Sequence, residues 1–143
     1  MRKIKFRAKE LYTNTWVYGH YTAGGYLRCN GELTVRHLIQ SSVFHDVNPD
    51  TVGQFTGMID RFGNEIYEDD IDLNIDEEGT EIGRVMYSEA FGKFICIYSE
   101  ASGNWFDFEG TQGEFIAHSC EVIGNAHDNK ELVKRRYDKE RPA

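Results

Sequence analysis

The sequence of 143 residues is poor in the features that mark secreted, membrane-bound and disordered proteins. It has two prolines and three cysteines, and no apolar run approaches the roughly 20 residues that a membrane-spanning helix needs. Cys29, Cys96 and Cys120 are odd in number and lack CxxC spacing, which argues against a disulfide framework and favours a reducing compartment. The basic N-terminus has no apolar segment of the kind found in signal peptides. We therefore expect a folded, cytoplasmic protein with no membrane partner.

Sequence signatures of the common enzyme classes are also missing. The chain contains no G-x-S-x-G nucleophile motif, no P-loop, no dinucleotide-binding glycine motif and no H-E-x-x-H zinc motif. His118 and Cys120 form one close pair of zinc-ligand residue types, whereas structural zinc sites usually draw such pairs from two places in the chain. The sequence therefore predicts a protein with no enzymatic activity, no cofactor and no bound metal.

Charge is distributed unevenly along the chain. Residues 1–47 hold seven Lys and Arg against three Asp and Glu, residues 48–128 hold three against eighteen, and residues 129–143 hold six against three. The acidic middle would repel a phosphate backbone, so any nucleic-acid binding would have to use the basic ends. The simpler interpretation is an acidic face that keeps the protein soluble and pairs with the basic ends, within the chain or between subunits.

Aromatic residues in short alternating segments, separated by glycine-rich turns, indicate an all-β fold: the chain has nine Phe, eight Tyr and two Trp. Asn30-Gly31 is the strongest hairpin signal, and Gly24-Gly25 is a second. Residues 60–64 can also close a hairpin, with Gly63 or Asn64 taking the positive φ. We predict a single domain over residues 1–143, with an N-terminal β-meander at 1–50, a small C-terminal β-barrel at 51–143 and a short helix from Asn129. The strands expected around the central segment 54–71 are 4–8, 16–21, 26–29, 32–39, 52–58, 82–87, 93–99, 105–108, 114–117 and 121–124.

The first predicted strand has a basic face. Lys3, Lys5 and Arg7 alternate with Ile4 and Phe6, so the basic side chains should point to solvent and the apolar ones inward. Basic side chains beside the aromatic residues of neighbouring strands could form a stacking and phosphate-binding surface.

An acidic segment in the middle of the chain has the spacing of a calcium loop but not its other requirements. Position 6 of such a loop needs glycine, and here it is Ile75. The acidic residues also alternate with Ile71, Leu73 and Ile75, which is the period of a strand that exposes its polar side chains. We therefore interpret the segment as a solvated strand face. Its spaced oxygen-bearing residues are Asp70, Asp72, Asn74, Asp76, Glu78 and Glu81.

Three separated segments of the chain resemble the YopX family, in the family's order. Residues 4–8, Ile-Lys-Phe-Arg-Ala, resemble its opening I-K-F-R-A. Residues 54–71, Gln-Phe-Thr-Gly-Met-Ile-Asp-Arg-Phe-Gly-Asn-Glu-Ile-Tyr-Glu-Asp-Asp-Ile, resemble its Q-Y-T-G-L-x-D-x-x-G-x-E-I-Y-E-G-D-I core. Residues 121–132 resemble its closing E-V-I-G-N-x-x-x-N-x-E-L. One departure is Asp69, which stands where the family usually has glycine, at a sharp corner that favours left-handed backbone.

The resemblance implies an all-β protein of prophage or mobile-element origin, cytoplasmic in a bacterial host, and it supplies no catalytic residues. We expect an accessory protein that acts by protein binding or self-assembly, with a host or phage protein or a second copy as the partner. The alternative is a nucleic-acid-binding module that uses the basic N-terminal strand and the C-terminal basic segment. The candidate interaction surface consists of Lys3, Lys5, Arg7, Asp69, Asp70, Asp72 and Asp76.

Overall fold

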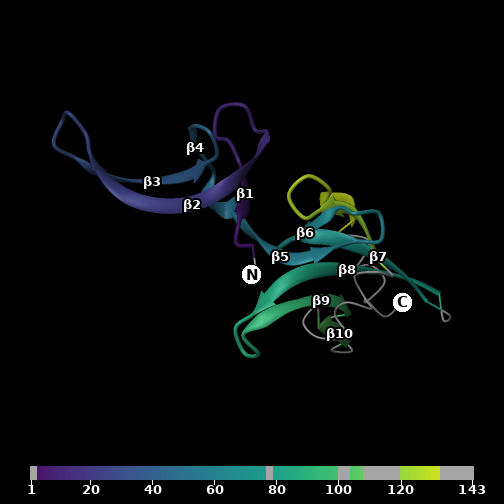
Figure 1. Ribbon diagram of the computed structural model, residues 1–143. Coiled ribbons are helices and arrows are strands. Elements are labelled where there is room, and N and C mark those ends of the chain that lie inside the picture. Colours follow the sequence, from purple (N-terminus) through teal and green to yellow (C-terminus); the bar gives the residue numbers. More distant parts are fainter. Residues whose placement is uncertain (1–2, 77–78, 100–103, 108–119, 133–143) are drawn as a thin grey trace. The chain divides into compact units, whose positions relative to one another are not determined.

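The computed structural model describes residues 3–76, 79–99, 104–107 and 120–132 (Figure 1). Antiparallel strands make up most of these residues, which confirms the predicted all-β class. The chain divides into two compact units, Met1–Phe55 and Thr56–Ala143, and each unit is described by itself. Within the described residues, no helix is both long and apolar enough to cross a membrane.

The first unit is an antiparallel sheet with the strand order β4-β3-β2-β1-β5. Its core is small and consists of Ala8, Ile39 and Val47, with partly buried aromatic and aliphatic side chains packed around them. The strands are β1 (Phe6–Lys9), β2 (Trp16–Leu27), β3 (Leu33–Gln40), β4 (Phe44–Asp46) and the start of β5 (Gly53–Ile59), with the 3-10 helix η1 (Pro49–Thr51) between the last two.

A long hairpin of β2 and β3 extends away from this core, and we call its outer part, residues 22–35, the arm (Figure 1). The predicted turn at Gly24-Gly25 is wrong, because β2 runs straight through both glycines and pairs them with Arg36 and Val35. The chain reverses instead at Asn30-Gly31, where Gly31 has a φ of 86° and the Asn30 side chain accepts the backbone N–H of Glu32. A positive φ is what glycine provides without a steric penalty.

The second unit contains an antiparallel sheet with the order β10-β9-β8-β7-β11. Among the described residues this sheet is open, whereas the sequence predicted a small β-barrel. A helix begins at Lys130 and is described as far as Leu132, and the rest of the predicted helix lies outside the described residues, as does the strand predicted at 114–117. The strands are β6 (Glu65–Tyr67), which follows the end of β5, β7 (Asp70–Asp76), β8 (Gly79–Ser88), β9 (Lys93–Ser99), β10 (Asn104–Asp107) and β11 (Cys120–Asn125).

The core of the second unit is larger than that of the first. It contains Ile66, Val85, Phe94, Cys96, Tyr98 and Cys120. Gly83 lies against this core so closely that an added Cβ would sit 2.5 Å from Cys96 Sγ and 2.8 Å from the Tyr98 ring. The predicted hairpin of residues 82–87 with 93–99 is confirmed, and β9 is buried on both faces at Phe94, Ile95 and Cys96 as expected.

Candidate functional site

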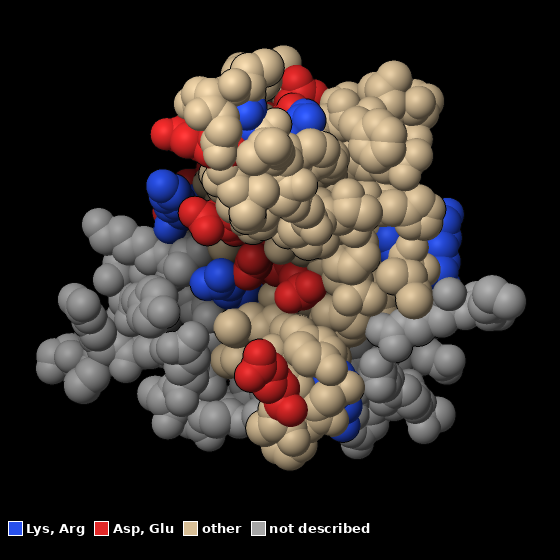
Figure 2. Space-filling view, turned by 90° about the vertical axis from the view of Figure 1, so that its left-hand side faces the viewer, with Lys and Arg blue, Asp and Glu red and all other residues tan. Residues whose placement is uncertain are grey.

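The arm exposes large apolar side chains. Leu27 and Leu33 are each 75% exposed, Val35 is 61% exposed and Tyr26 is 42% exposed. Figure 2 views the molecule from the side toward which the arm extends in Figure 1, and the upper part of that view shows tan surface with acidic and basic side chains at several places. A cluster of exposed apolar side chains of this kind is characteristic of a surface that contacts another molecule.

One edge of the arm is also open. β4 pairs with β3 only at Leu38, Ile39 and Gln40, so it stops short of the arm. Within the described residues, β3 has β2 as its other neighbour and no strand beside its outer half on the β4 side. Open strand edges present unpaired backbone donors and acceptors, which favour pairing with another strand.

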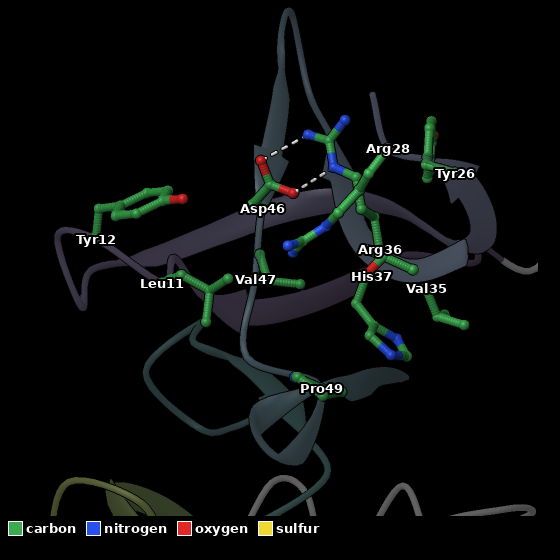
Figure 3. Close-up of a pocket in the computed structure, with 11 residues that line it drawn as sticks. Leu11, Tyr12, Tyr26, Arg28, Val35, Arg36, His37, Asp46, Val47 and Pro49 are labelled. Atoms are coloured by element: carbon green, nitrogen blue, oxygen red, sulfur yellow. Dashed lines mark hydrogen bonds and ion pairs between the residues drawn. The ribbon is translucent and has the colours of Figure 1, made fainter. Parts of the chain in front are cut away.

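A cavity of about 510 Å³ lies where the arm meets the rest of the first unit (Figure 3). Its walls are partly apolar, from Leu11, Val35, Val47 and Pro49, and partly aromatic, from the two tyrosines that Figure 3 shows on opposite sides of the view. The remaining lining residues are Tyr12, Tyr26, Arg28, Thr34, Arg36, His37 and Asp46.

An ion pair organises the wall of this cavity. Arg36 donates from Nε and Nη2 to the two carboxylate oxygens of Asp46, at 2.8 and 2.6 Å. These hydrogen bonds hold the pKa of Asp46 below its usual value, against the smaller opposing effect of burial. The Arg36 guanidinium also lies 4.9 Å from the centre of the Tyr26 ring. The pair therefore couples the arm to β4 rather than offering an unsatisfied charge to a ligand.

The basic strand is less exposed than its alternation predicted. Arg7 is only 6% exposed, and its guanidinium lies 4.5 Å from the centre of the Trp16 ring. Lys5 lies over the Phe55 ring at 5.4 Å, while Lys3 precedes β1 and is exposed. The prediction of an outward-facing Arg7 is wrong, because β1 lies between β2 and β5 and the Trp16 ring from β2 covers it.

The acidic corner at Asp69 has the geometry that its glycine-like position indicated. Asp69 has a φ of 68° in the left-handed region. Its carboxylate accepts two hydrogen bonds from Arg84, at 2.7 and 3.1 Å, and lies 3.2 Å from His127 Nε2. Burial alone would raise the pKa of Asp69, but the contacts with His127 and Arg84 outweigh it and hold the pKa below its usual value.

The prediction that β7 exposes its polar side chains to solvent is wrong. Asp70 and Asp72 are 1% and 0% exposed, and Asn74 is 6% exposed, because β7 lies between β8 and β11. Asp70 accepts the backbone N–H of Tyr67 at 2.7 Å, which makes it part of the corner. Asp76 ends the strand, and its side chain lies outside the described part of the structure.

Asp72 is the most unusual of the buried acids. Its Oδ2 lies 3.8 Å from Cys96 Sγ, and its Oδ1 has no hydrogen-bond partner among the described residues. Burial, and then the negative charge of Asp70, raise the pKa of Asp72 well above its usual value. Burial, and then the charge of Asp72, raise the pKa of Cys120 to about 12.

Asp60 is a third buried carboxylate, and its role is to build a turn. It is 2% exposed and accepts backbone N–H groups from Phe62, Asn64 and Val122 at 2.8 to 3.0 Å. Gly63 takes the predicted positive φ, 84°, in the same turn. Although burial opposes them, the hydrogen bonds from Val122 and Asn64 hold the pKa of Asp60 below its usual value.

Metal-binding geometry is not formed by the residues that the structure describes. No group of three or more His, Cys, Asp and Glu side chains converges there. Glu78 of the calcium-like spacing and His118 of the zinc-like pair lie outside the described residues. The candidate residues thus fall into a basic set in the first unit and an acidic set in the second, and of the buried acids Asp60 and Asp70 accept backbone N–H groups at turns.

The two left-handed corners at Gly63 and Asp69 lie within residues 54–71, the central segment that resembles the family. The family model described as YopX protein matches residues 5–134. The chain belongs to the YopX family. No curated protein matches this YopX-family chain significantly. A crystal structure of protein EF1440 from Enterococcus faecalis is similar to it, with a TM-score of 0.54, 20% identity and coverage of 93% of this chain and 99% of that one.

At this level of identity, the similarity to the Enterococcus faecalis structure concerns the fold alone.

The exposed arm residues were absent from the candidate residues predicted from the sequence. The signal that could have found them is the position of Leu27 and Leu33 on either side of the Asn30-Gly31 turn. Residues that flank the tip of a long hairpin extend beyond the core, so apolar side chains there stay exposed unless a partner covers them.

Proposed function

We propose that this YopX-family chain is a non-enzymatic accessory protein of a phage or other mobile element. It acts in the cytoplasm of a bacterial host by binding protein through the arm, either a second copy of itself or a host or phage protein. The exposure of Leu27, Leu33 and Val35 on an open-edged hairpin is the observation that carries this proposal. Interface cores are depleted in charge and use apolar and aromatic side chains, and the arm has this composition.

The test compares the wild type with a variant of the arm that carries Leu27→Thr, Leu33→Thr and Val35→Thr. Threonine keeps the preference for strand while removing apolar surface. A matched control is Ile4→Thr, because Ile4 is 58% exposed but lies outside the arm. We expect the arm variant, and not the control, to lose mass on a sizing column with light scattering or to lose proteins captured from extract of a lysogenic host. Equal mass and an equal captured set for all three proteins would overturn the proposal.

Nucleic-acid binding is the second candidate, supported by the balance of seven Lys and Arg against four Asp and Glu in residues 1–55. A salt titration with labelled single- and double-stranded DNA separates it from protein binding. A nucleic-acid binder should weaken steeply as salt rises, and Lys3→Ala with Lys5→Ala should weaken it further. The absence of binding at low salt would exclude this candidate.

A further inference from the structure

The open edge of β3 can be assigned residue by residue from its hydrogen bonds. Val47 donates its backbone N–H to the carbonyl of His37 at 2.9 Å, so the backbone of His37 faces β4. Backbone groups alternate sides along a strand, so those of Val35 and Leu33 face the same way. β4 pairs no further along β3 than Leu38, so the groups of Leu33 and Val35 face an unoccupied edge within the described part of the chain.

The other side of β3 is already used. Arg28 donates its backbone N–H to the carbonyl of Glu32 at 2.8 Å, and Tyr26 lies opposite Thr34. The backbone groups of Thr34 and Glu32 therefore face β2, and β3 can accept a further strand only at its outer edge. Within the described residues the outer edge of β2 is also open along the arm, because β1 pairs with β2 only from Trp16 to Gly19.

The arm lacks the devices that usually protect such an edge. Residues 22–35 contain no proline and no lysine, and they form a two-stranded ribbon with exposed residues on both faces. Isolated two-stranded ribbons are marginally stable, and a third strand is normally needed. Exposed edges without lysine or proline favour pairing with another chain.

We propose that the edge of β3 at residues 33–35 pairs antiparallel with the same edge of a second copy, about a twofold axis at Thr34. This inference rests on the proposed function and names its partner. In this register Leu33 of each copy lies opposite Val35 of the other, and both residues present their backbone groups to the shared edge. The arrangement is self-complementary, as a twofold interface requires.

The side chains agree with this register. Glu32 of each copy lies opposite Arg36 of the other, in a pair without backbone hydrogen bonds, where Cα atoms are about 4.5 Å apart. Opposite charges at such positions favour cross-strand pairing, and Arg36, whose side chain is 41% exposed, would meet Glu32 while it keeps its ion pair with Asp46. Leu27 pairs with Leu33 within the hairpin, so both lie with Val35 on one face of the sheet. The four-stranded sheet of two arms therefore joins the exposed apolar side chains of both copies on one face.

β4 limits the length of the added strand. Val47 already bonds to His37 and Asp46 lies opposite Leu38, so a second arm can pair with β3 no further than Arg36. In the proposed register Glu32 of the second copy lies opposite Arg36, and its chain turns away at Asn30 and Gly31.

The experiment uses the full chain with Cys29→Ser, because Cys29 is exposed and would cross-link on its own. In this background Thr34→Cys places two thiols opposite each other on the twofold axis, within the range that a disulfide spans. Thr22→Cys is the matched control, since Thr22 is exposed on β2 and lies away from the axis. Mild oxidation should convert the Thr34→Cys protein to disulfide-linked dimer and leave the Thr22→Cys protein monomeric on a non-reducing gel.

A second variant tests the edge without new thiols. Val35→Pro removes a backbone donor from the open edge but none from the hairpin, and proline is tolerated at such positions. We expect light scattering to show twice the chain mass for Cys29→Ser and a single chain mass when Val35→Pro is added, with strand content unchanged by circular dichroism.

A monomeric Cys29→Ser protein, or a dimer that does not cross-link at Thr34, would overturn the pairing of two copies. Equal cross-linking at Thr22 and Thr34 would do the same. If the protein were monomeric but captured another protein through the arm, the proposed function would hold and its partner would be that protein. Failure of both experiments would exclude the arm as a binding surface.

Discussion

The carboxylate of Asp69 and the guanidinium of Arg84 join the corner before β7 to the middle of β8. Arg84 donates to Asp69 at 2.7 and 3.1 Å. The backbone of Asp69 adds two further links, donating to the Val85 carbonyl and accepting from the Ala126 N–H, each at 2.8 Å. Through its side chain and its backbone, Asp69 thus links the corner before β7 to strand β8 and to the segment that follows β11.

Two substitutions separate the side-chain and backbone effects at this corner. Asp69→Ala loses the charge-assisted hydrogen bonds and keeps a left-handed residue, so we expect a loss of about 2–3 kcal/mol in the free energy of unfolding. Asp69→Gly loses the same bonds but removes the backbone strain, and it should be about 1 kcal/mol more stable than Asp69→Ala. Urea unfolding measures both, and equal stability of the two variants would contradict strain at Asp69.

Asp72 should make the protein less stable as pH rises. Its folded-state pKa is raised, so ionisation of the unfolded chain above about pH 3.8 favours unfolding until the folded carboxyl also ionises. Asp72→Asn removes this effect and should stabilise the protein by about 1–3 kcal/mol at pH 7. The gain should shrink as pH falls and vanish below pH 3.8, the ordinary pKa of aspartate. Thermal unfolding of both proteins at several pH values measures it, and a gain independent of pH would count against a buried neutral carboxyl.

Gly83 should tolerate no side chain. A Cβ there would lie 2.5 Å from Cys96 Sγ and 2.8 Å from the Tyr98 ring, both in the core. We expect Gly83→Ala to cost about 1–3 kcal/mol through displacement of these side chains. Gly24→Ala is a suitable control, since an added Cβ there comes no closer than 3.9 Å to another atom. Comparable melting temperatures for the two variants would show that the core can move aside.

Arg7 should act as a packing residue of the first unit. Its guanidinium covers Trp16 at 4.5 Å, so Arg7→Ala should lower the free energy of unfolding by about 1–2 kcal/mol through loss of the cation–π contact and of buried chain. Lys3→Ala, at an exposed position before β1, should change it by less than about 0.5 kcal/mol. Urea titrations followed by tryptophan fluorescence compare the two. If Arg7→Ala left stability unchanged, the exposed basic face predicted from the sequence would regain support.

Local chemistry made the turns predictable. Asn30-Gly31 and the turn that contains Gly63 were found from residue type, because a positive φ is a property that the sequence itself encodes. Gly24-Gly25 misled the prediction, since glycine permits a turn without requiring one, and here both residues stay in the strand. The three residues of β4 were missed because so short a strand has no detectable period.

The candidate site was predicted less well than the fold. Alternation along β7 placed Asp70 and Asp72 in solvent, but a strand with neighbours on both edges and packed faces buries both sets of side chains. The arm went unnoticed for the opposite reason: Leu27, Leu33 and Val35 are typical core residues by type, and only their distance from the core of the first unit leaves them exposed.

The sequence by itself determined the all-β class, the reversals at glycine and asparagine, and the left-handed corner at Asp69, since these depend on backbone preferences of a few adjacent residues. The tertiary structure alone decided which polar side chains are buried and which apolar ones are exposed. Burial depends on which strands lie beside a residue, and those strands come from distant parts of the chain. For that reason Asp72 belongs to the core, and the apolar arm is where this protein meets a partner in our proposal.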